Sequence, residues 1–187
     1  MGSNGNTENN SSRQAEQAGR FDRFTGEINS APSHDAILAL LKDRLLDVCG
    51  VDMASVFLID SLKMQLVSWL VLPGESLRKI RIPIDKTSVA GYTASTREQV
   101  FINDPYDNDE LTGIDPGLKF DSSWDSQAGI RTRQVLSTPI MVRRSLLGVI
   151  QLMNKRDGEV FAEPDKHHVE KLANTLGNAL LRLQGPS

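Results

Sequence analysis

The chain has one cysteine, Cys49, among its 187 residues. A single thiol cannot form an internal disulfide, and it cannot supply a cysteine metal cluster. No apolar run approaches the roughly 20 residues of a membrane-spanning helix, and no hydrophobic signal segment opens the chain. These absences lead us to expect a soluble protein of the reducing cytoplasm.

An excess of positive charge is also missing. The chain has 21 Lys and Arg residues against 24 Asp and Glu residues, which gives a net charge of −3 and a pI of about 5.6. Nucleic acids and anionic membranes attract proteins with a basic face or a basic overall field. We therefore expect no nucleic-acid partner and no membrane partner.

Residues 1–20 contain almost nothing that a folded protein could bury. Such a composition favours a tail that is disordered or foreign to the protein. The remaining residues 21–184 are enough for one domain with its own core, since domains usually have about 100–200 residues.

Hydrophobic spacing predicts helices at both ends of the domain. One helix covers about residues 15–28, and a second extends from Ser33, which can cap it, to Gly50, where it would stop. The last helix begins near Asp165, because acids and an early proline suit a helix N-terminus. The apolar faces consist of Phe21, Phe24 and Ile28 in the first helix, and of Val169, Leu172, Leu176, Leu180 and Leu183 in the last.

Between these helices the pattern changes to that of β-strands. Apolar runs rich in β-branched and aromatic residues predict six strands, over residues 54–59, 66–72, 78–83, 99–103, 135–142 and 146–153. Residues 88–96 suit a short helix. The polar stretch 104–130 predicts a lid, because a loop this long in a compact domain is usually functional or contains a short helix. The fold class is therefore α+β, with one mixed or antiparallel sheet.

Several short motifs support this plan: Ser55–Asp60, Ile82-Pro83, Ser88–Gly91, Ile102–Asp104, Arg131–Arg133, Pro139-Ile140 and Gly148–Lys155. In this order they resemble a GAF domain, the small-molecule sensor module of signalling proteins. The resemblance covers most of the chain and is nearest to the GAF domains of cyclic-nucleotide phosphodiesterases and adenylyl cyclases. It implies a central six-stranded sheet, with the N- and C-terminal helices on one face and a short helix plus the lid on the other.

The subfamily is indicated by Asn154, Lys155, Phe161 and Asp165. They match a family pattern of Asn-Lys, a gap, Phe, three residues and Asp-Glu, although Lys166 replaces the Glu. Lys155 leaves the last strand where Asp165 opens the last helix, so we predict an ion pair that is structural and does not touch the ligand. If the pair is exposed, it is worth at most about 1 kcal/mol.

The same resemblance implies a small-molecule ligand between the sheet and the lid, with cyclic AMP and cyclic GMP as candidates. The matching ligand positions are Ser55, Val71, Leu72, Val89, Ala90, Asp125, Thr132 and Gln151. Gln151 stands where cyclic-GMP-binding relatives have Glu, and Val71-Leu72 replaces an aromatic–acid pair that holds the base in one relative. For each position, ordinary sheet or turn polarity is an equal alternative.

The helix opening at Ser88–Gly91 has small residues that let backbone N–H groups approach a phosphate. Simple helix packing explains the same residues. The lid is acidic, with Asp104, Asp107, Asp109, Glu110, Asp115, Asp121 and Asp125, and would repel a phosphate unless these groups point away or Arg131 and Arg133 offset them. The spacing is not that of a calcium loop, so we predict a solvated acidic face and no metal site.

No set of residues predicts catalysis. GAF domains that reduce free methionine sulfoxide use several cysteines, and one cysteine cannot complete that thiol cycle. Covalent bilin attachment needs a suitably placed thiol, whereas Cys49 ends a helix that we expect to pack outside the pocket. His34, His167 and His168 lie at helix starts, where solvated side chains are expected.

We therefore expect a non-catalytic regulatory domain that binds a small molecule and signals to an output domain or protein through helix-mediated homodimerisation. The alternative is a ligand-free dimerisation scaffold of a larger signalling protein, because the apolar stripes of the terminal helices suit both. An enzyme with an unrecognised site is the least favoured class.

Overall fold

A single six-stranded sheet divides the molecule into two layers. The computed structural model describes residues 4–73 and 79–184. All strand pairs are antiparallel, in the order β3-β2-β1-β6-β5-β4. The strands are β1 (Val51–Asp60), β2 (Gln65–Leu72), β3 (Arg81–Pro83), β4 (Val100–Ile102), β5 (Val135–Val142) and β6 (Ser145–Lys155). The predicted α+β plan is confirmed; the strand expected from residue 78 begins at Arg81, and residue 78 itself lies outside the described part.

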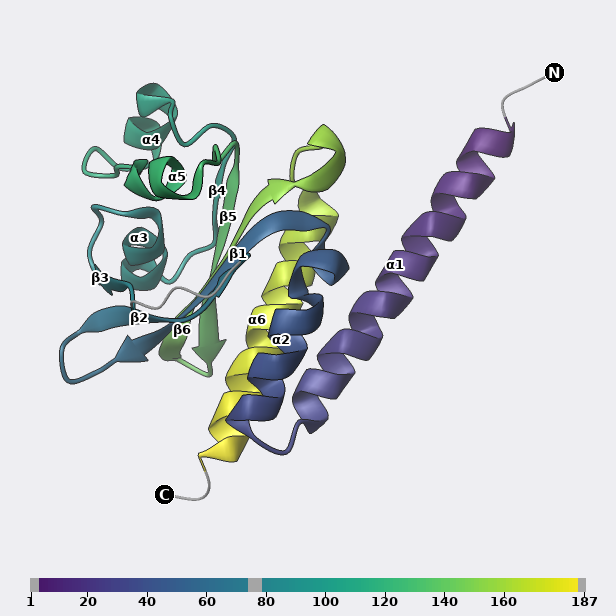
Figure 1. The fold of residues 1–187 in the computed structure, drawn as a ribbon, viewed down its shortest axis with the longest axis horizontal. Helices are drawn as coiled ribbons and strands as arrows, with labels where there is room; N and C mark the ends of the chain where they lie inside the picture. Colours follow the sequence, from purple (N-terminus) through teal and green to yellow (C-terminus); the bar gives the residue numbers. More distant parts are fainter. Residues whose placement is uncertain (1–3, 74–78, 185–187) are drawn as a thin grey trace.

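The helices cover the two faces of the sheet as the resemblance implies. One face carries α1 (Asn4–Ser30), α2 (His34–Cys49) and α6 (Glu163–Leu183). The other carries α3 (Val89–Thr96) and the lid, which contains α4 (Asn108–Ile114) and α5 (Ser123–Ala128) (Figure 1). A 3₁₀ turn, η1 (Arg156–Gly158), connects β6 to α6. None of the helices in the described residues is both long and apolar enough to cross a bilayer.

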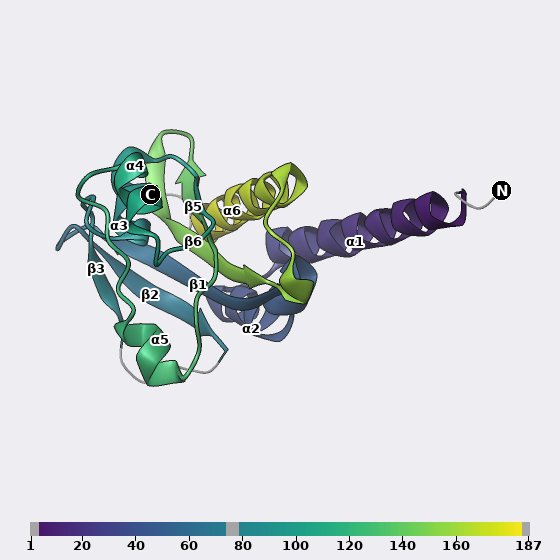
Figure 2. The same cartoon turned by 90° about the horizontal axis from the view of Figure 1, so that it is seen from above.

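The first helix differs from the expectation of a tail over residues 1–20. It begins at Asn4, and its first half projects away from the body of the domain in both views (Figures 1 and 2). No proline precedes Pro32, and good helix formers occupy residues 14–18, so a helix anchored at Phe21 can extend toward the N-terminus without a breaker. Residues 1–3 lie outside the described part.

The main core lies between the sheet and the terminal helices. Phe24 and Ile28 of α1 are fully buried there, as are Leu172 and Leu176 of α6, so the predicted apolar faces are confirmed. Ser33 caps α2 by accepting a hydrogen bond from the Ala36 N–H at 3.1 Å. Gly50 ends that helix in the left-handed conformation, with φ of 63°, which glycine adopts without strain.

Close packing of α6 on β5 depends on Gly177. A Cβ at this position would lie 2.8 Å from the Met141 carbonyl oxygen and 2.8 Å from Val142 Cγ2. In contrast, a Cβ at the exposed Gly26 of α1 would meet nothing within 4 Å. The two helical glycines therefore have opposite packing environments.

We predict that Gly177→Ala lowers the free energy of unfolding by about 1–3 kcal/mol, because the added methyl group forces α6 away from β5. The matched variant Gly26→Ala should be neutral or stabilise by up to about 1 kcal/mol, since alanine is the better helix former. Urea unfolding of both variants measures the difference. Equal effects of the two substitutions would contradict the close approach.

Candidate functional site

A row of side chains crosses the α3 side of the sheet. Ser55 of β1 lies opposite Val71 of β2 and Gln151 of β6, and Gln151 lies opposite Ser137 of β5. Directly paired residues point to the same face of a sheet. The Thr93 hydroxyl of α3 donates to Ser137 Oγ at 2.8 Å, which places the row under α3. Three predicted ligand positions, Ser55, Val71 and Gln151, are thus brought together.

The polar groups of this row are unevenly satisfied. Thr93 and Ser137 are fully buried and bonded to each other, and Gln151 Nε2 approaches Ser137 Oγ at 3.4 Å. Ser55 is 7% exposed, and its hydroxyl has no hydrogen-bond partner within residues 4–73 and 79–184. No side-chain polar atom in that part of the chain is completely sealed without a partner. The Ser55 hydroxyl therefore stays reachable from outside.

The prediction that Leu72 contacts a ligand beside Val71 is wrong. Leu72 pairs with Ala54 and packs against the main core beneath the terminal helices. Neighbouring residues of a strand point to opposite faces, so Val71 and Leu72 cannot both face the lid. Trp69, which the register between β1 and β2 skips, interrupts the alternation and packs against the same core as Leu72.

The start of α3 is closely packed. Val89 and Ala90 bury their side chains in two separate apolar clusters, and Ser88 Oγ caps the helix by accepting the Gly91 N–H at 3.1 Å. A Cβ on Gly91 would lie 2.6 Å from the Pro83 carbonyl oxygen. Packing therefore accounts for the small residues here. The first backbone N–H groups of the helix still have no acceptor within it.

Asp125 joins two parts of the lid region through its hydrogen bonds to Tyr106 and Thr132. This carboxylate is 5% exposed and accepts hydrogen bonds from Thr132 N at 2.5 Å, Thr132 Oγ1 at 2.8 Å and the Tyr106 hydroxyl at 2.7 Å. The hydrogen bond to Asp125 raises the pKa of Tyr106. The Arg131 guanidinium lies 4.1 Å from the centre of the Tyr106 ring. Asp125 and Thr132, predicted as ligand contacts, thus bind each other.

The other lid carboxylates mostly serve turns and helix caps. Asp107 caps α4, and Glu110 accepts from the backbone N–H groups of Asn103 and Asp104. A hydrogen bond from the Gly117 N–H and the ion pair with Lys86, at 3.0 Å, lower the pKa of Asp115. Among the described residues, no three His, Cys, Asp or Glu side chains are grouped so that they could hold a metal ion.

Asn154 joins the end of β6 to the segment that follows the lid. Its Oδ1 accepts from the N–H groups of Arg133 at 2.6 Å and Gln134 at 3.4 Å, and its Nδ2 donates to the Arg131 carbonyl at 2.8 Å. Asn154 has φ of 56°, a left-handed conformation that asparagine tolerates better than most residues. The side chain is 4% exposed, so this connection is shielded from water.

The predicted ion pair between Lys155 and Asp165 is confirmed. Lys155 Nζ lies 2.8 Å from Asp165 Oδ2 and 3.3 Å from Glu159 Oε2, and Asp165 Oδ2 also accepts the Ala162 N–H. The side chains of Lys155 and Asp165 are 17% and 16% exposed, so the pair is more buried than the sequence suggested. Burial by itself would lower the pKa of Lys155, but the bonds and charges of Asp165 and Glu159 outweigh it and raise that pKa.

Sequence reasoning missed three residues of this region. Gln134 accepts the Phe161 N–H at 3.0 Å and donates to the Glu159 carbonyl at 2.6 Å, and thereby connects the lid to the start of α6. Thr93 and Ser137 form the buried polar pair under α3. The available signal was a serine inside the otherwise apolar strand 135–142, since a buried hydroxyl requires a partner.

Cys49 lies on the far side of the sheet from α3. It ends α2 and packs against the main core, as predicted. Burial, with a smaller effect from the charge of Asp165, raises the pKa of its thiol to about 12. A thiol with this pKa is almost entirely protonated at neutral pH, so Cys49 has no nucleophilic character.

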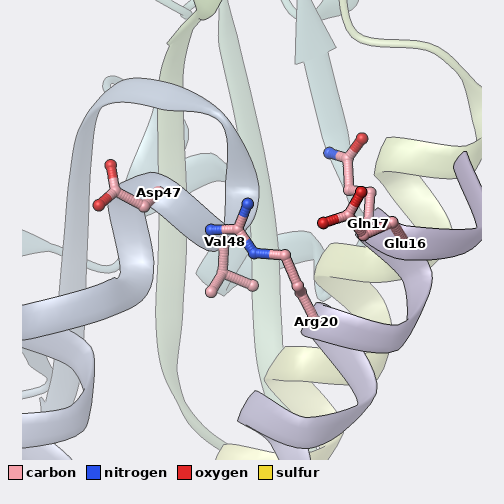
Figure 3. A pocket seen from close by; sticks show the side chains of 5 residues that line it. All are labelled: Glu16, Gln17, Arg20, Asp47 and Val48. Atoms are coloured by element: carbon pink, nitrogen blue, oxygen red, sulfur yellow. The ribbon is translucent and has the colours of Figure 1, made fainter. Parts of the chain in front are cut away.

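A crevice between α1 and the end of α2 has a volume of about 200 Å³ (Figure 3). Its walls are Glu16, Gln17, Arg20, Asp47 and Val48. Sites for small organic molecules usually enclose about 300–1,000 Å³ and are mostly apolar. This crevice is therefore a poor candidate for a ligand site.

Replacing Lys155 with alanine should lower the free energy of unfolding by about 1–3 kcal/mol, because Asp165 would remain half-buried without its cation. Lys171→Ala is the matched control, since its pair with Asp22 is exposed on both sides. Because folding raises the pKa of Lys155, its contribution is complete below the ordinary value of 10.5 and is lost as the pH rises through the folded value. Urea titrations at neutral and alkaline pH measure both effects; a Lys155→Ala loss no larger than that of the control would contradict them.

We expect Cys49 to resist alkylation in the folded protein at pH 8, because its raised pKa and its packing remove the reactive thiolate. Mass spectrometry after iodoacetamide treatment should show labelling only when urea is added. Rapid labelling of the native protein would contradict the raised pKa and the packing of this half-buried thiol.

Comparison with known proteins agrees with this geometry. The GAF domain profile matches residues 33–180. A probable 3',5'-cyclic phosphodiesterase, pde-5, from Caenorhabditis elegans is 31% identical over 159 residues, which cover 79% of this chain and 20% of that protein. A dual 3',5'-cyclic-AMP and -GMP phosphodiesterase 11 from Drosophila melanogaster is 35% identical over 81 residues, or 43% of this chain and 5% of that protein. The chain thus spans a fifth or less of these relatives.

Solved structures share the fold. The free methionine-R-sulfoxide reductase from Neisseria meningitidis has a TM-score of 0.72 at 16% identity, with 92% of each chain covered. The GAF domain of a phosphoenolpyruvate-protein phosphotransferase from Coxiella burnetii has a TM-score of 0.70 at 20% identity, covering 90% of this chain and 94% of that one. Together, the match over residues 33–180 and the six-stranded sheet flanked by helices show that this chain belongs to the GAF domain family.

Proposed function

We propose that the chain is a regulatory domain that binds one small polar molecule between the sheet, α3 and the lid. The observation that carries this proposal is the Ser55 hydroxyl, which is nearly buried yet has no partner within the described residues. Buried polar groups are normally hydrogen-bonded. A ligand that forms a hydrogen bond with the Ser55 hydroxyl would supply the missing partner, and it would lie beside Gln151 of the same row.

A cyclic nucleotide fits the chemistry of this face. Gln151 can donate and accept hydrogen bonds, as recognition of a purine edge requires. Ala90, Phe57 and Val149 form a buried apolar cluster beside the row, which would border the base of such a ligand. The relatives named as cyclic phosphodiesterases also favour cyclic AMP or cyclic GMP as the ligand.

The chain's own residues favour binding without catalysis. The structural neighbour that reduces methionine sulfoxide shares the fold, but this chain has one cysteine, which lies on the opposite side of the sheet with a raised pKa. A thiol cycle that forms a disulfide needs a second thiol. A single reduced thiol also suits a cytoplasmic location.

A structural change caused by ligand binding could be transmitted from the lid to the terminal helices. Asp125 binds Thr132, and the next residue, Arg133, donates its N–H to Asn154 of β6. Gln134 follows and accepts the Phe161 N–H, just before α6 begins. Movement of the lid would therefore shift the start of α6. We propose that this shift is transmitted through a homodimer formed by the terminal helices, of which α1 projects beyond the body (Figure 2).

A ligand-free dimerisation scaffold is the second candidate. It is favoured by the bonds between Asp125 and Thr132, which occupy two predicted ligand positions, and by the burial of Val89 and Ala90 in apolar clusters. Both candidates require the terminal helices at the interface, so ligand binding decides between them.

Thermal unfolding with cyclic AMP and cyclic GMP separates the two candidates. A ligand at a hundredfold excess over its Kd should add about 2.7 kcal/mol to the folded state, which raises Tm by about 5–10 °C in a domain of this size. Ser55→Ala and Gln151→Ala should reduce the shift, whereas Ser145→Ala, an exposed position on the same strand as Gln151, should retain it. A stable dimer without a shift from either nucleotide would favour the scaffold.

A further inference from the structure

An apolar groove of about 500 Å³ opens at the end of the sheet where α6 finishes. It is lined by His34, Leu58, Ile59, Ser61, Trp69, Leu146, Leu147, Leu180 and Gln184. These residues come from five elements: the start of α2, the end of β1, the middle of β2, the start of β6 and the end of α6. Figure 1 shows the β5–β6 turn and the last turn of α6 at the same end of the molecule. None of them belongs to the row of Ser55 and Gln151, so the groove is separate from the proposed ligand site.

Three exposed apolar side chains adjoin groove residues in the sequence. Leu62, next to Ser61, is 97% exposed; Met64 in the same turn is 66% exposed; and Leu181, next to Leu180, is 43% exposed. A small molecule seated in the groove would leave these side chains in water. Exposed apolar side chains beside a concave site favour a macromolecular partner.

Three cations adjoin residues of this apolar surface in the sequence. Arg143 and Arg144 form the β5–β6 turn, just before the groove residues of β6, and Lys63 lies between Leu62 and Met64. Within residues 4–73 and 79–184, none of these three side chains has an ion-pair partner. The nearby Asp60 is bound by Arg81 at 3.2 Å. Asp35, beside the groove residue His34, adds one exposed carboxylate, so the neighbours of the groove keep an excess of positive charge, which favours an acidic partner.

We propose that this groove docks an amphipathic helix of a partner protein, with its apolar side in the groove and Asp or Glu residues on its flanks. Helix-in-groove recognition uses apolar anchors spaced by three and four residues, and charge complementarity sets the partner and the register. A second copy of this chain does not offer such a helix, because the apolar faces of α2, α6 and the second half of α1 are buried in their own core.

The test uses a fluorescent synthetic helix with leucines at helical spacing on one side and glutamates on its flanks. Two control peptides are a scrambled order of the same residues and a version with lysines in place of the glutamates. Fluorescence anisotropy with the full chain should show binding of the acidic amphipathic helix that is about tenfold tighter than that of either control, and that weakens as salt is added. Equal binding of all three peptides would overturn the proposal.

Variants locate the site. The double substitution Arg143→Glu with Arg144→Glu, and separately Leu181→Glu, should each weaken binding about tenfold. Arg23→Glu and Val160→Glu, at exposed positions elsewhere, should leave it unchanged. All five substituted positions are exposed, so the unfolding midpoints of the four variants should stay close to that of the parent chain and confirm that each variant folds.

Three further results would overturn the proposal. One is peptide binding that the groove variants do not alter. Another is tighter binding to anionic lipid vesicles than to the acidic peptide, which would assign the surface to a membrane. The third is self-association in sedimentation that Leu181→Glu abolishes while no peptide binds, which would assign it to a second copy. Because no nucleotide is used, the outcome is independent of the proposed ligand site.

Discussion

The pairing of β6 with both β1 and β5 is the constraint on which the rest of the structure depends. β6 is a central strand, and its contact with β1 is so close that a Cβ on Gly148 would clash with the Phe57 carbonyl oxygen. This fixed register aligns Ser55, Gln151 and Ser137 under α3. The alternate residues of the same strands build the main core beneath the terminal helices, so one register decides both the stability of the domain and the composition of its candidate site.

The end of β6 connects the two faces of the sheet. Asn154 holds the backbone that follows the lid, and Lys155 holds Asp165 at the start of α6. Gln134 adds a second connection between these parts. Neighbouring residues of one strand thus bind the lid on one side and a terminal helix on the other. This junction therefore joins the segment after the lid to the start of α6.

The sequence predicted the helices and strands well because each depends on local hydrophobic periodicity. The ion pair of Lys155 with Asp165 was also predictable, since a strand end and a helix start lie near each other in sequence. Leu72 was assigned to the wrong face of the sheet. A resemblance to a family matches sequence positions, but it does not establish which side chains of a strand face the lid and which face the core. The tail was expected to be disordered because composition records what a segment can bury, whereas a helix can extend from an anchored neighbour.

The sequence by itself determined the fold family, the terminal helices, the presence of one cysteine and the presence of a lid, because each follows from residue types and short spacings. Only the tertiary structure decided that Asp125 binds Thr132, that Ser55 has no partner among the residues that the structure describes, and that Leu72 faces the core. It also brought the ends of β1, β6 and α6 together into one apolar groove. These features depend on contacts between residues far apart in the chain, and local patterns carry no information about which distant atoms meet.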